Sequence, residues 1–263
     1  MKPFISGAAC ILLLAACSKN NTEKPPDENT GVVKYLMKMT ENSGGAGEAS
    51  TLAYNAQNRL ISMEGNDDTG MRLAYDNNGN VVMAEVWTED VLSRNYIHYV
   101  NGVPDTAVER YFRRADNSLL ETQFYRYTVE NDRVVRIRMR DSAGQTSPSD
   151  IYLRYQGGNL TSLLQVPPAS MTDTIVFSEW TYGTKRNPFT GCKTEYYVTP
   201  VGPAALFQSA NEPLTMRFRI PSTSHDFREK YVYLYDKEGY PVREARVDEG
   251  ATDSLIIHYE YRR

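Results

Sequence analysis

The chain has 263 residues, with 33 acidic and 29 basic side chains and a formal net charge of −4. Acids and bases are mixed along its length, which argues against a nucleic-acid partner bound through its phosphates. Three cysteines are present. Removal of a signal peptide would leave Cys17 and Cys192, so we expect no intramolecular disulfide if Cys17 is acylated.

Residues 1–16 have the features of a secretion signal. Lys2 precedes an apolar stretch, Ala8 to Ala16, that is too short to span a bilayer as a mature helix. Leu14-Ala15-Ala16-Cys17 resembles the lipobox of bacterial lipoproteins, in which cleavage falls before the cysteine and that cysteine is acylated. The resemblance implies lipidation at Cys17 and an outer-membrane anchor. The alternative is an ordinary secreted protein whose signal happens to end in cysteine.

Residues 17–31 comprise the cysteine and a polar segment with Pro25-Pro26 and no apolar periodicity, which predicts a disordered tether. Fully extended, the tether would reach about 45 Å. Some surface-exported lipoproteins carry acids just after the cysteine, whereas Ser18 to Asn21 contains none. We therefore favour the periplasmic leaflet slightly over the cell surface. No internal linker divides residues 32–263, which we expect to form one domain.

Within that domain a large apolar residue, any residue and a tyrosine precede a polar turn six times. The tyrosines are Tyr54, Tyr75, Tyr127, Tyr155, Tyr182 and Tyr235, and in five units an apolar residue follows seven positions later: Ile61, Val82, Val134, Phe189 and Val242. This pattern predicts repeated β-hairpins. Because twist accumulates in a long sheet, we expect an all-β antiparallel meander that forms a strongly curved sheet, a half-barrel or a barrel.

One segment predicts a helix. Residues 203–210 begin with Pro203, which suits a first helical turn, and Asn211 follows as a stop signal. We expect one short helix there, in the stretch between Phe189 and Lys230 where the hairpin spacing breaks.

The C-terminal third carries several motifs in order. They are Trp180-Thr181-Tyr182, Asn187-Pro188-Phe189, Ser209-Ala210-Asn211, the turn from Tyr235 to Pro241, and Tyr259-Glu260-Tyr261. With a lipobox in front, they resemble a family of Bacteroidetes outer-membrane lipoproteins of unknown function, which have YD-like repeats and a porin-like β-meander fold. The second asparagine usual in that family is Glu212 here. The resemblance implies fold and anchoring, and carries no known activity.

No residue pattern predicts catalysis or metal binding. His98, His225 and His258 lack a second histidine or acid at zinc-ligand spacing. We expect His98 and His258 on a solvated strand face, the alternative being a shared ligand site. For Cys192 we expect a structural role, since a reactive thiol needs a basic neighbour. Asp76 to Asn80 reads as a hairpin turn rather than a calcium loop.

Three features leave alternatives open. The tyrosines suit half-buried sheet faces or a stacking platform for a glycan. Arginines in the middle of the chain suit cross-strand ion pairs or a basic stripe for an anionic glycan or lipid head group: Arg110, Arg113, Arg114, Arg126, Arg136, Arg138 and Arg140. Four Asp-Ser/Thr pairs, at Asp105, Asp141, Asp173 and Asp253, suit either strand starts or O-glycosylation acceptors.

These observations favour a non-enzymatic envelope lipoprotein that binds a ligand, plausibly a glycan, without catalytic residues, metal or cofactor. Two alternatives remain: a structural subunit that contacts another outer-membrane protein, and a carrier of an apolar ligand. Exposed apolar patches or free strand edges would favour the subunit, and a closed interior lined by tyrosine and methionine would favour the carrier.

Overall fold

The computed structural model describes residues 33–42, 47–140, 146–167, 174–192, 207–223, 225–249 and 254–263, with only the backbone described for 146–148. The signal peptide, Cys17 and the tether lie outside these residues. The described chain is almost entirely β-strand, as the hairpin pattern predicts.

Sixteen strands follow one another along the chain. Their bounds are β1 (Tyr35–Asn42), β2 (Glu48–Tyr54), β3 (Leu60–Gly65), β4 (Gly70–Tyr75), β5 (Val81–Trp87), β6 (Val91–Val100), β7 (Val103–Arg113), β8 (Leu119–Glu130), β9 (Arg133–Arg140), β10 (Thr146–Gln156), β11 (Asn159–Val166), β12 (Val176–Arg186), β13 (Asn211–Ile220), β14 (His225–Tyr235), β15 (Pro241–Asp248) and β16 (Ser254–Arg262). A single 3-10 turn, η1 (Pro221–Thr223), joins β13 to β14.

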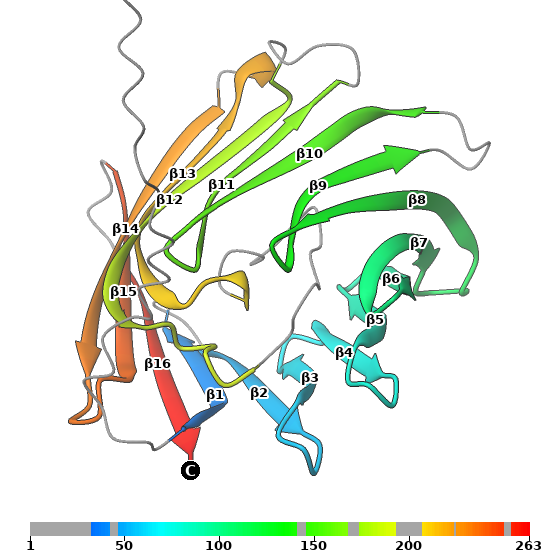
Figure 1. Ribbon diagram of the computed structural model, residues 1–263. Helices are drawn as coiled ribbons and strands as arrows, with labels where there is room; N and C mark the ends of the chain where they lie inside the picture. Colours follow the sequence, from blue (N-terminus) through cyan, green and yellow to red (C-terminus); the bar gives the residue numbers. More distant parts are fainter. Residues whose placement is uncertain are drawn as a thin grey trace, which may run out of the picture.

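Every strand pairs antiparallel with its neighbours in sequence, and β1 also pairs with β16, so the meander closes into a barrel (Figure 1). The structure therefore confirms the all-β meander and selects the closed barrel among the predicted shapes. Closure leaves no free sheet edge among the described strands.

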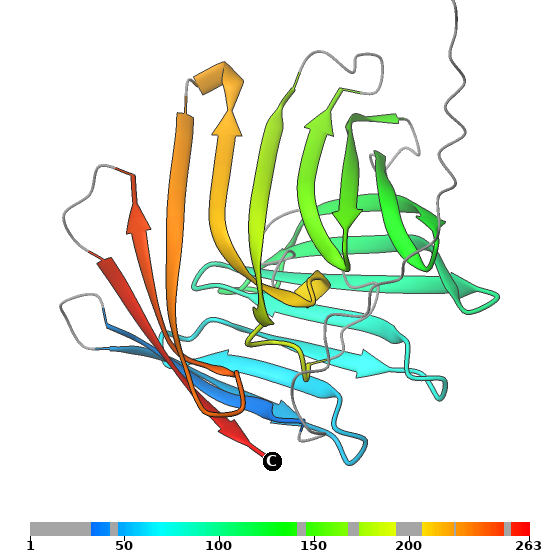
Figure 2. The same cartoon turned by 60° about the vertical axis from the view of Figure 1, so that its left-hand side comes forward.

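The barrel has two distinct ends. At the proximal end lie Val33, Arg263 and the hairpin turns that follow the even-numbered strands, whereas the turns after the odd-numbered strands form the distal end. Figure 2 shows the C-terminus at the proximal rim beside β1. Both ends of the described chain therefore lie at the proximal end.

A ring of β-bulges encircles the barrel near the proximal end. Each of the eight strand pairs that meet there contains one extra residue close to a tyrosine or its equivalent: Met37, Ile61, Val82, Asp105, Val135, Thr161, Leu214 and Val242. Bulges increase local twist and are common at barrel rims. The apolar residues seven positions after the tyrosines were expected to belong to regular second strands of the hairpins. The structure corrects this, because Ile61, Val82 and Val242 are bulge residues and Phe189 lies outside the strands.

The buried residues that begin these strands follow the tyrosines by six positions, one position before the bulge residues. Leu60 and Val81 pair directly with Tyr54 and Tyr75 and are almost fully buried. The tyrosine hydroxyls donate to carbonyl groups on the strand immediately before, as Tyr75 on β4 does to Leu60 on β3 at 2.5 Å. Equivalent bonds run from Tyr54, Tyr99 and Tyr182 to the carbonyls of Leu36, Val81 and Leu160. Each such bond links the proximal ends of two neighbouring strands.

The described ends of the connection between β12 and β13 lie in the proximal interior. Cys192 lies 3.3 Å from the Tyr54 hydroxyl on β2, while Arg133 on β9 donates to the carbonyl of Gln208. Because β2 and β9 lie nearly opposite one another in the ring, these two ends contact opposite sides of the barrel. Phe189 and Cys192 belong to the same buried core as the strand interiors.

The predicted helix falls mostly outside the described residues. Phe207 and Gln208, at its expected end, have helical backbone conformation. Asn211 does not cap them, because its backbone N–H donates to Asn159 and its side chain donates to the carbonyl of Lys185. Glu212, the departure from the resembled family, begins β13 and accepts a hydrogen bond from Tyr235 at 3.0 Å.

Candidate ligand-binding face

The outer wall of the barrel carries rows of charged residues. They face outward across several strands, as in the row from Arg72 through Glu85 and Arg94 to Arg110 on β4 to β7. Side chains on the opposite face of these strands, such as Leu73, Ala84 and Ile97, form the core. The described residues form no helix long and apolar enough to cross a bilayer.

Five arginines gather on the outer wall of β7 to β10, which we call the arginine face. They are Arg110, Arg126, Arg136, Arg138 and Arg154. Arg126 lies directly opposite Arg138, and Arg110 lies directly opposite Arg94 on β6. Like charges in such positions are destabilising. The fold places them together nevertheless.

A single buried acid partly offsets this charge. Asp150 on β10 lies opposite Arg138, and its side chain is only 3% exposed. Arg136 and Arg138 both form ion pairs with it, and the hydrogen bond that Arg136 donates to Asp150 raises the pKa of Arg136. Arg110 and Arg126 have no carboxylate within ion-pair distance among the described residues. Their exposed guanidinium groups remain available to an external anion.

Aromatic rings accompany the arginines. Tyr96 on β6 is 44% exposed and lies opposite Val108 on the outward face. Tyr152 lies opposite Arg136, whose guanidinium carbon is 5.1 Å from the ring centroid. At about 4.8 Å per strand, the face from β6 to β10 is roughly 19 Å wide. Its chemistry combines positive charge with ring surfaces over an extended area.

The wall formed by β13 and β14 offers a contrast. Arg217 and Arg228 form another directly opposed arginine pair there. Arg217 makes a two-point contact with Asp226 at 2.9 and 2.6 Å, and Arg228 lies 3.5 Å from Glu249. Both charges are therefore neutralised within the protein.

The predicted ion pairs form for part of the stripe. Arg136 and Arg138 pair with Asp150, Arg113 with Asp116 and Arg114 with Asp68, whereas Arg110 and Arg126 have no carboxylate within ion-pair distance among the described residues.

The inner face does not expose the tyrosines as a stacking platform for a glycan. Several tyrosine hydroxyls are used inside the wall, and two buried carboxylates hold others. Glu109 accepts from Ser93 and Tyr125, at 2.5 and 2.6 Å. Glu244, on the strand opposite in the ring, accepts from Tyr259 at 2.6 Å and from Arg246. These carboxylates are at most 4% exposed, so their contacts stabilise the wall rather than offer a site.

Burial dominates the ionisation of these tyrosines. Desolvation, followed by the charge of Glu109, raises the pKa of Tyr125 well above its ordinary value. The same two causes, with Glu244 as the neighbour, raise the pKa of Tyr233. The Tyr125 hydroxyl therefore stays protonated throughout the physiological pH range and donates to Glu109.

The other residues considered from sequence have structural or solvated positions. His98 and His258 are exposed, as predicted, and lie on β6 and β16, which are not neighbours, so they share no site. Exposed His225 pairs with Ile220. Among the described residues no group of three potential ligands could hold a metal ion. Of the possible acceptors, Thr106 lies partly exposed on β7 and Ser254 is exposed at the start of β16.

Cys192 and the Asp76 turn behave as predicted. Cys192 is 1% exposed, and burial raises its pKa to about 12, which makes the thiol unreactive. Asp76 accepts from the backbone N–H groups of Asn78 and Asn80, and Gly79 has a φ of 87°. The segment is a hairpin turn.

Sequence reasoning identified part of the arginine face. Arg110, Arg126, Arg136 and Arg138 belong to the predicted stripe, whereas Arg113 and Arg114 lie at the distal turn after β7. Tyr96, Tyr152 and Arg154 were missed. Their alternation with buried Ile97, Ile151 and Leu153 is the signal that places them outward.

Comparison with known proteins supports the fold. A porin-like protein from Bacteroides uniformis has a TM-score of 0.55 and 15% identity, covering 89% of this chain and 98% of that one. A porin-like protein from Bacteroides vulgatus has a TM-score of 0.55 and 14% identity, covering 88% and 99%. No family model matches the chain, and no curated protein matches it. At such identities the likeness establishes the barrel fold alone.

Proposed function

We propose that the protein is a non-enzymatic lipoprotein of the bacterial outer membrane whose barrel stands in the aqueous envelope and binds an anionic glycan. The arginine face, with Tyr96 and Tyr152, is the binding surface. Cys17 carries the lipid that anchors the barrel. The periplasmic leaflet is favoured over the cell surface.

One observation carries the glycan proposal. Arg110 and Arg126 each lie opposite another arginine, are exposed, and have no ion-pair partner among the described residues. Guanidinium groups bind carboxylates and phosphates through two parallel hydrogen bonds. A bound polyanion would relieve the repulsion that the fold builds into this wall.

The exposed aromatic rings favour an anionic glycan over other anionic ligands. Sugar rings present C–H groups that pack on aromatic faces, and Tyr96 and Tyr152 lie among the arginines. The width of the face suits several linked sugars rather than a single small anion. The two alternatives have less support, because the barrel has no free edge among the described strands and because Phe189, Cys192 and Phe207 pack with the strand interiors in its core.

The test uses a form that begins at Ser18, since the ring of strand pairs closes between Tyr35 and Arg262. Polygalacturonate serves as the anionic glycan and dextran as the neutral one. We expect binding of polygalacturonate only, and about tenfold or greater weakening in Arg126→Gln/Arg138→Gln, because two charge-assisted hydrogen bonds are lost.

Arg217→Gln/Arg228→Gln is the matched control, since it removes an opposed arginine pair that acids already neutralise. We expect this control to retain its affinity. Equal weakening in both double variants, or equal binding of dextran, would refute the arginine face as the site.

The lipid anchor has its own test. Replacing Cys17 with Ala should move the protein from the membrane fraction to the soluble envelope fraction. Retention in the membrane fraction would contradict acylation at Cys17.

A further inference from the structure

The proximal and distal ends of the barrel differ in charge. Among the described residues, the distal turns and adjoining strand ends carry nine exposed acids against four arginines. The acids are Glu48, Asp67, Asp68, Glu89, Asp90, Asp116, Asp226, Asp248 and Glu249, and the arginines are Arg113, Arg114, Arg140 and Arg219. The proximal turns and strand ends reverse this balance. Their basic residues are Lys34, Arg59, Arg133, Lys185, Arg186, Lys237, Arg262 and Arg263, and the acids outside the barrel interior are Asp76, Asp105, Glu130, Asp132, Asp236 and Glu238.

Much of the proximal positive charge is not neutralised by the protein. Arg59, Arg133 and Arg262 stack on tyrosine rings, with guanidinium carbons 4.8 to 5.7 Å from the centroids. Arg186 stacks on Tyr240 at 5.1 Å. None of these four arginines has a carboxylate within ion-pair distance in the described part of the chain. Stacking on a neutral ring positions a guanidinium group and leaves its charge intact.

Exposed aliphatic side chains concentrate at the same end. Most of the large apolar residues that are over one-third exposed lie in the proximal half, namely Val33, Ile61, Val100, Leu214, Val232 and Leu234. Ile61 and Leu214 belong to the bulge ring, whose other members include Met37, Val82, Val135 and Val242. Basic residues, tyrosines and aliphatic residues together are the composition of protein surfaces at a membrane interface.

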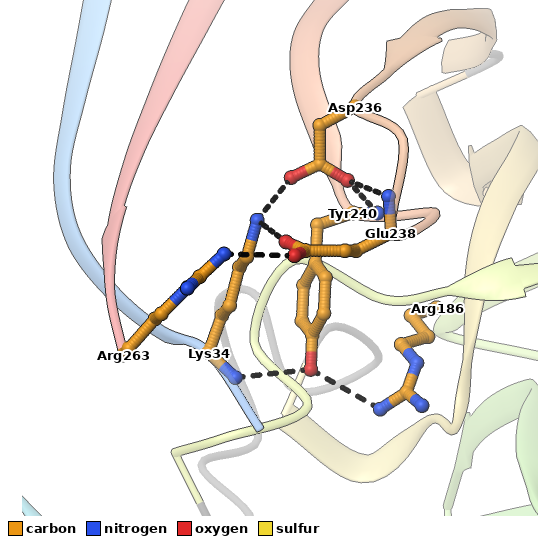
Figure 3. Close-up of polar contacts among 6 residues, drawn as sticks. All are labelled: Lys34, Arg186, Asp236, Glu238, Tyr240 and Arg263. Carbon is orange, nitrogen blue, oxygen red and sulfur yellow. Dashed lines mark hydrogen bonds and ion pairs between the residues drawn. The ribbon is translucent and has the colours of Figure 1, made fainter. Parts of the chain in front are cut away.

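The chain enters the barrel at this end through a fixed point. Lys34 forms ion pairs with Asp236 and Glu238, and its backbone N–H donates to the Tyr240 hydroxyl at 3.0 Å (Figure 3). Arg263 joins the same cluster through Glu238 at 3.0 Å. This cluster holds both ends of the described chain against the β14–β15 turn. The described chain therefore begins, at Val33, on the proximal side of the barrel.

We propose that the proximal end docks on an anionic bilayer surface, with basic residues near the head groups and the aliphatic rim in the interfacial region. The distal end, rich in acids, then points away from the membrane, since a negatively charged surface attracts one end and repels the other. This orientation leaves the arginine face accessible at the side of the barrel. The docking proposal depends on the proposed function only through the lipid at Cys17.

The test measures co-sedimentation of the unlipidated form that begins at Ser18 with two kinds of vesicle. One contains phosphatidylglycerol and phosphatidylcholine in equal parts, and the other contains phosphatidylcholine alone. We expect binding to the anionic vesicles that is lost at high salt, and about tenfold weaker partitioning for Lys185→Gln/Lys237→Gln, because each basic residue near the surface adds to the attraction. Both lysines are exposed, so the fold should tolerate their replacement.

Two further variants separate this proposal from the others. Leu234→Ser, which removes a 55% exposed rim side chain, should weaken anionic-vesicle binding about threefold or more. The double variant Arg126→Gln/Arg138→Gln, which tests glycan binding, should leave vesicle binding unchanged. No binding of either vesicle, or equal weakening by Lys185→Gln/Lys237→Gln and by Arg126→Gln/Arg138→Gln, would overturn the docking proposal and leave the glycan proposal untouched.

Discussion

The inner and outer faces of the same strands use their polar side chains differently. On the inner face, Glu109 and Glu244 are almost fully buried, and their oxygens accept hydrogen bonds from tyrosine and serine hydroxyls. On the outer face, Arg110 and Arg126 are exposed and have no ion-pair partner among the described residues. Polar groups that form their hydrogen bonds within the fold stabilise it. Exposed charged groups that have no ion-pair partner within the fold are available to a ligand.

The largest effect should come from an inner carboxylate. Glu244→Ala would leave the Tyr259 hydroxyl and Arg246, 2.6 and 2.5 Å away, without their acceptor. We expect a loss of roughly 3–5 kcal/mol in the free energy of unfolding, as for other broken buried pairs. Urea unfolding measures it, and the wild-type barrel should unfold in a single transition.

Glu260→Ala is the outer-face control, because this 65% exposed acid pairs only loosely with Lys38 at 3.6 Å. Its loss should stay within about 1 kcal/mol. Comparable losses for Glu244→Ala and Glu260→Ala would remove the distinction between the two faces.

A tyrosine hydroxyl should have an intermediate effect. Tyr75→Phe removes the donor to the carbonyl of Leu60, which is buried. We expect a loss of about 1–2 kcal/mol in thermal or urea unfolding, because a buried acceptor loses its partner. Tyr96→Phe, on the exposed outer face, should be neutral. If Tyr75→Phe is neutral too, the tyrosine-to-carbonyl bonds do not hold the hairpins together.

Glu212 should show a smaller effect of opposite sign. Burial raises the pKa of Glu212 above 4.5, although its backbone and Tyr235 hydrogen bonds oppose the rise. A carboxyl with a raised folded pKa costs stability at neutral pH, and this cost disappears as the pH falls through the folded pKa towards 4.5. Glu212→Gln should therefore stabilise the barrel at pH 7 by less than about 1 kcal/mol and flatten its stability between pH 7 and 4.5. Destabilisation at pH 7 would show that the ionised form is needed.

The smallest effect on stability should come from the arginine face itself. Arg126→Gln removes a charge directly opposite Arg138. We expect the free energy of unfolding to change by less than about 0.5 kcal/mol, and to rise if it changes, because repulsion is relieved. A clear loss of stability would mean that Arg126 is part of the wall's own bonding.

The sequence predicted the architecture because the signals for it are local. Alternation and turn residues around Tyr75 and Asp76 suffice to define a hairpin, and repetition implies a meander. Closure could not be predicted, since it depends on β1 meeting β16 more than 200 residues away. The bulges were misread because Ile61 and Val82 keep a regular spacing in the chain while interrupting the pairing in space.

The candidate site was predictable only in part, for a similar reason. The alternation in β9 places Arg136 and Arg138 on one face. Their neutralisation by Asp150 and the isolation of Arg126 depend on register between strands, which a single sequence does not reveal. Glu109 lies inside the wall for the same reason, although its position in the chain suggested a partner for the arginine stripe.

Modification of arginines by phenylglyoxal, read residue by residue by mass spectrometry with and without polygalacturonate, tests the central claim most directly. We expect the glycan to protect Arg110, Arg126 and Arg154 strongly, and to leave Arg217 and Arg228 on β13 and β14 as reactive as in its absence. Equal protection of both sets of arginines, or protection of neither at saturating glycan, would contradict the assignment of the arginine face as the binding surface.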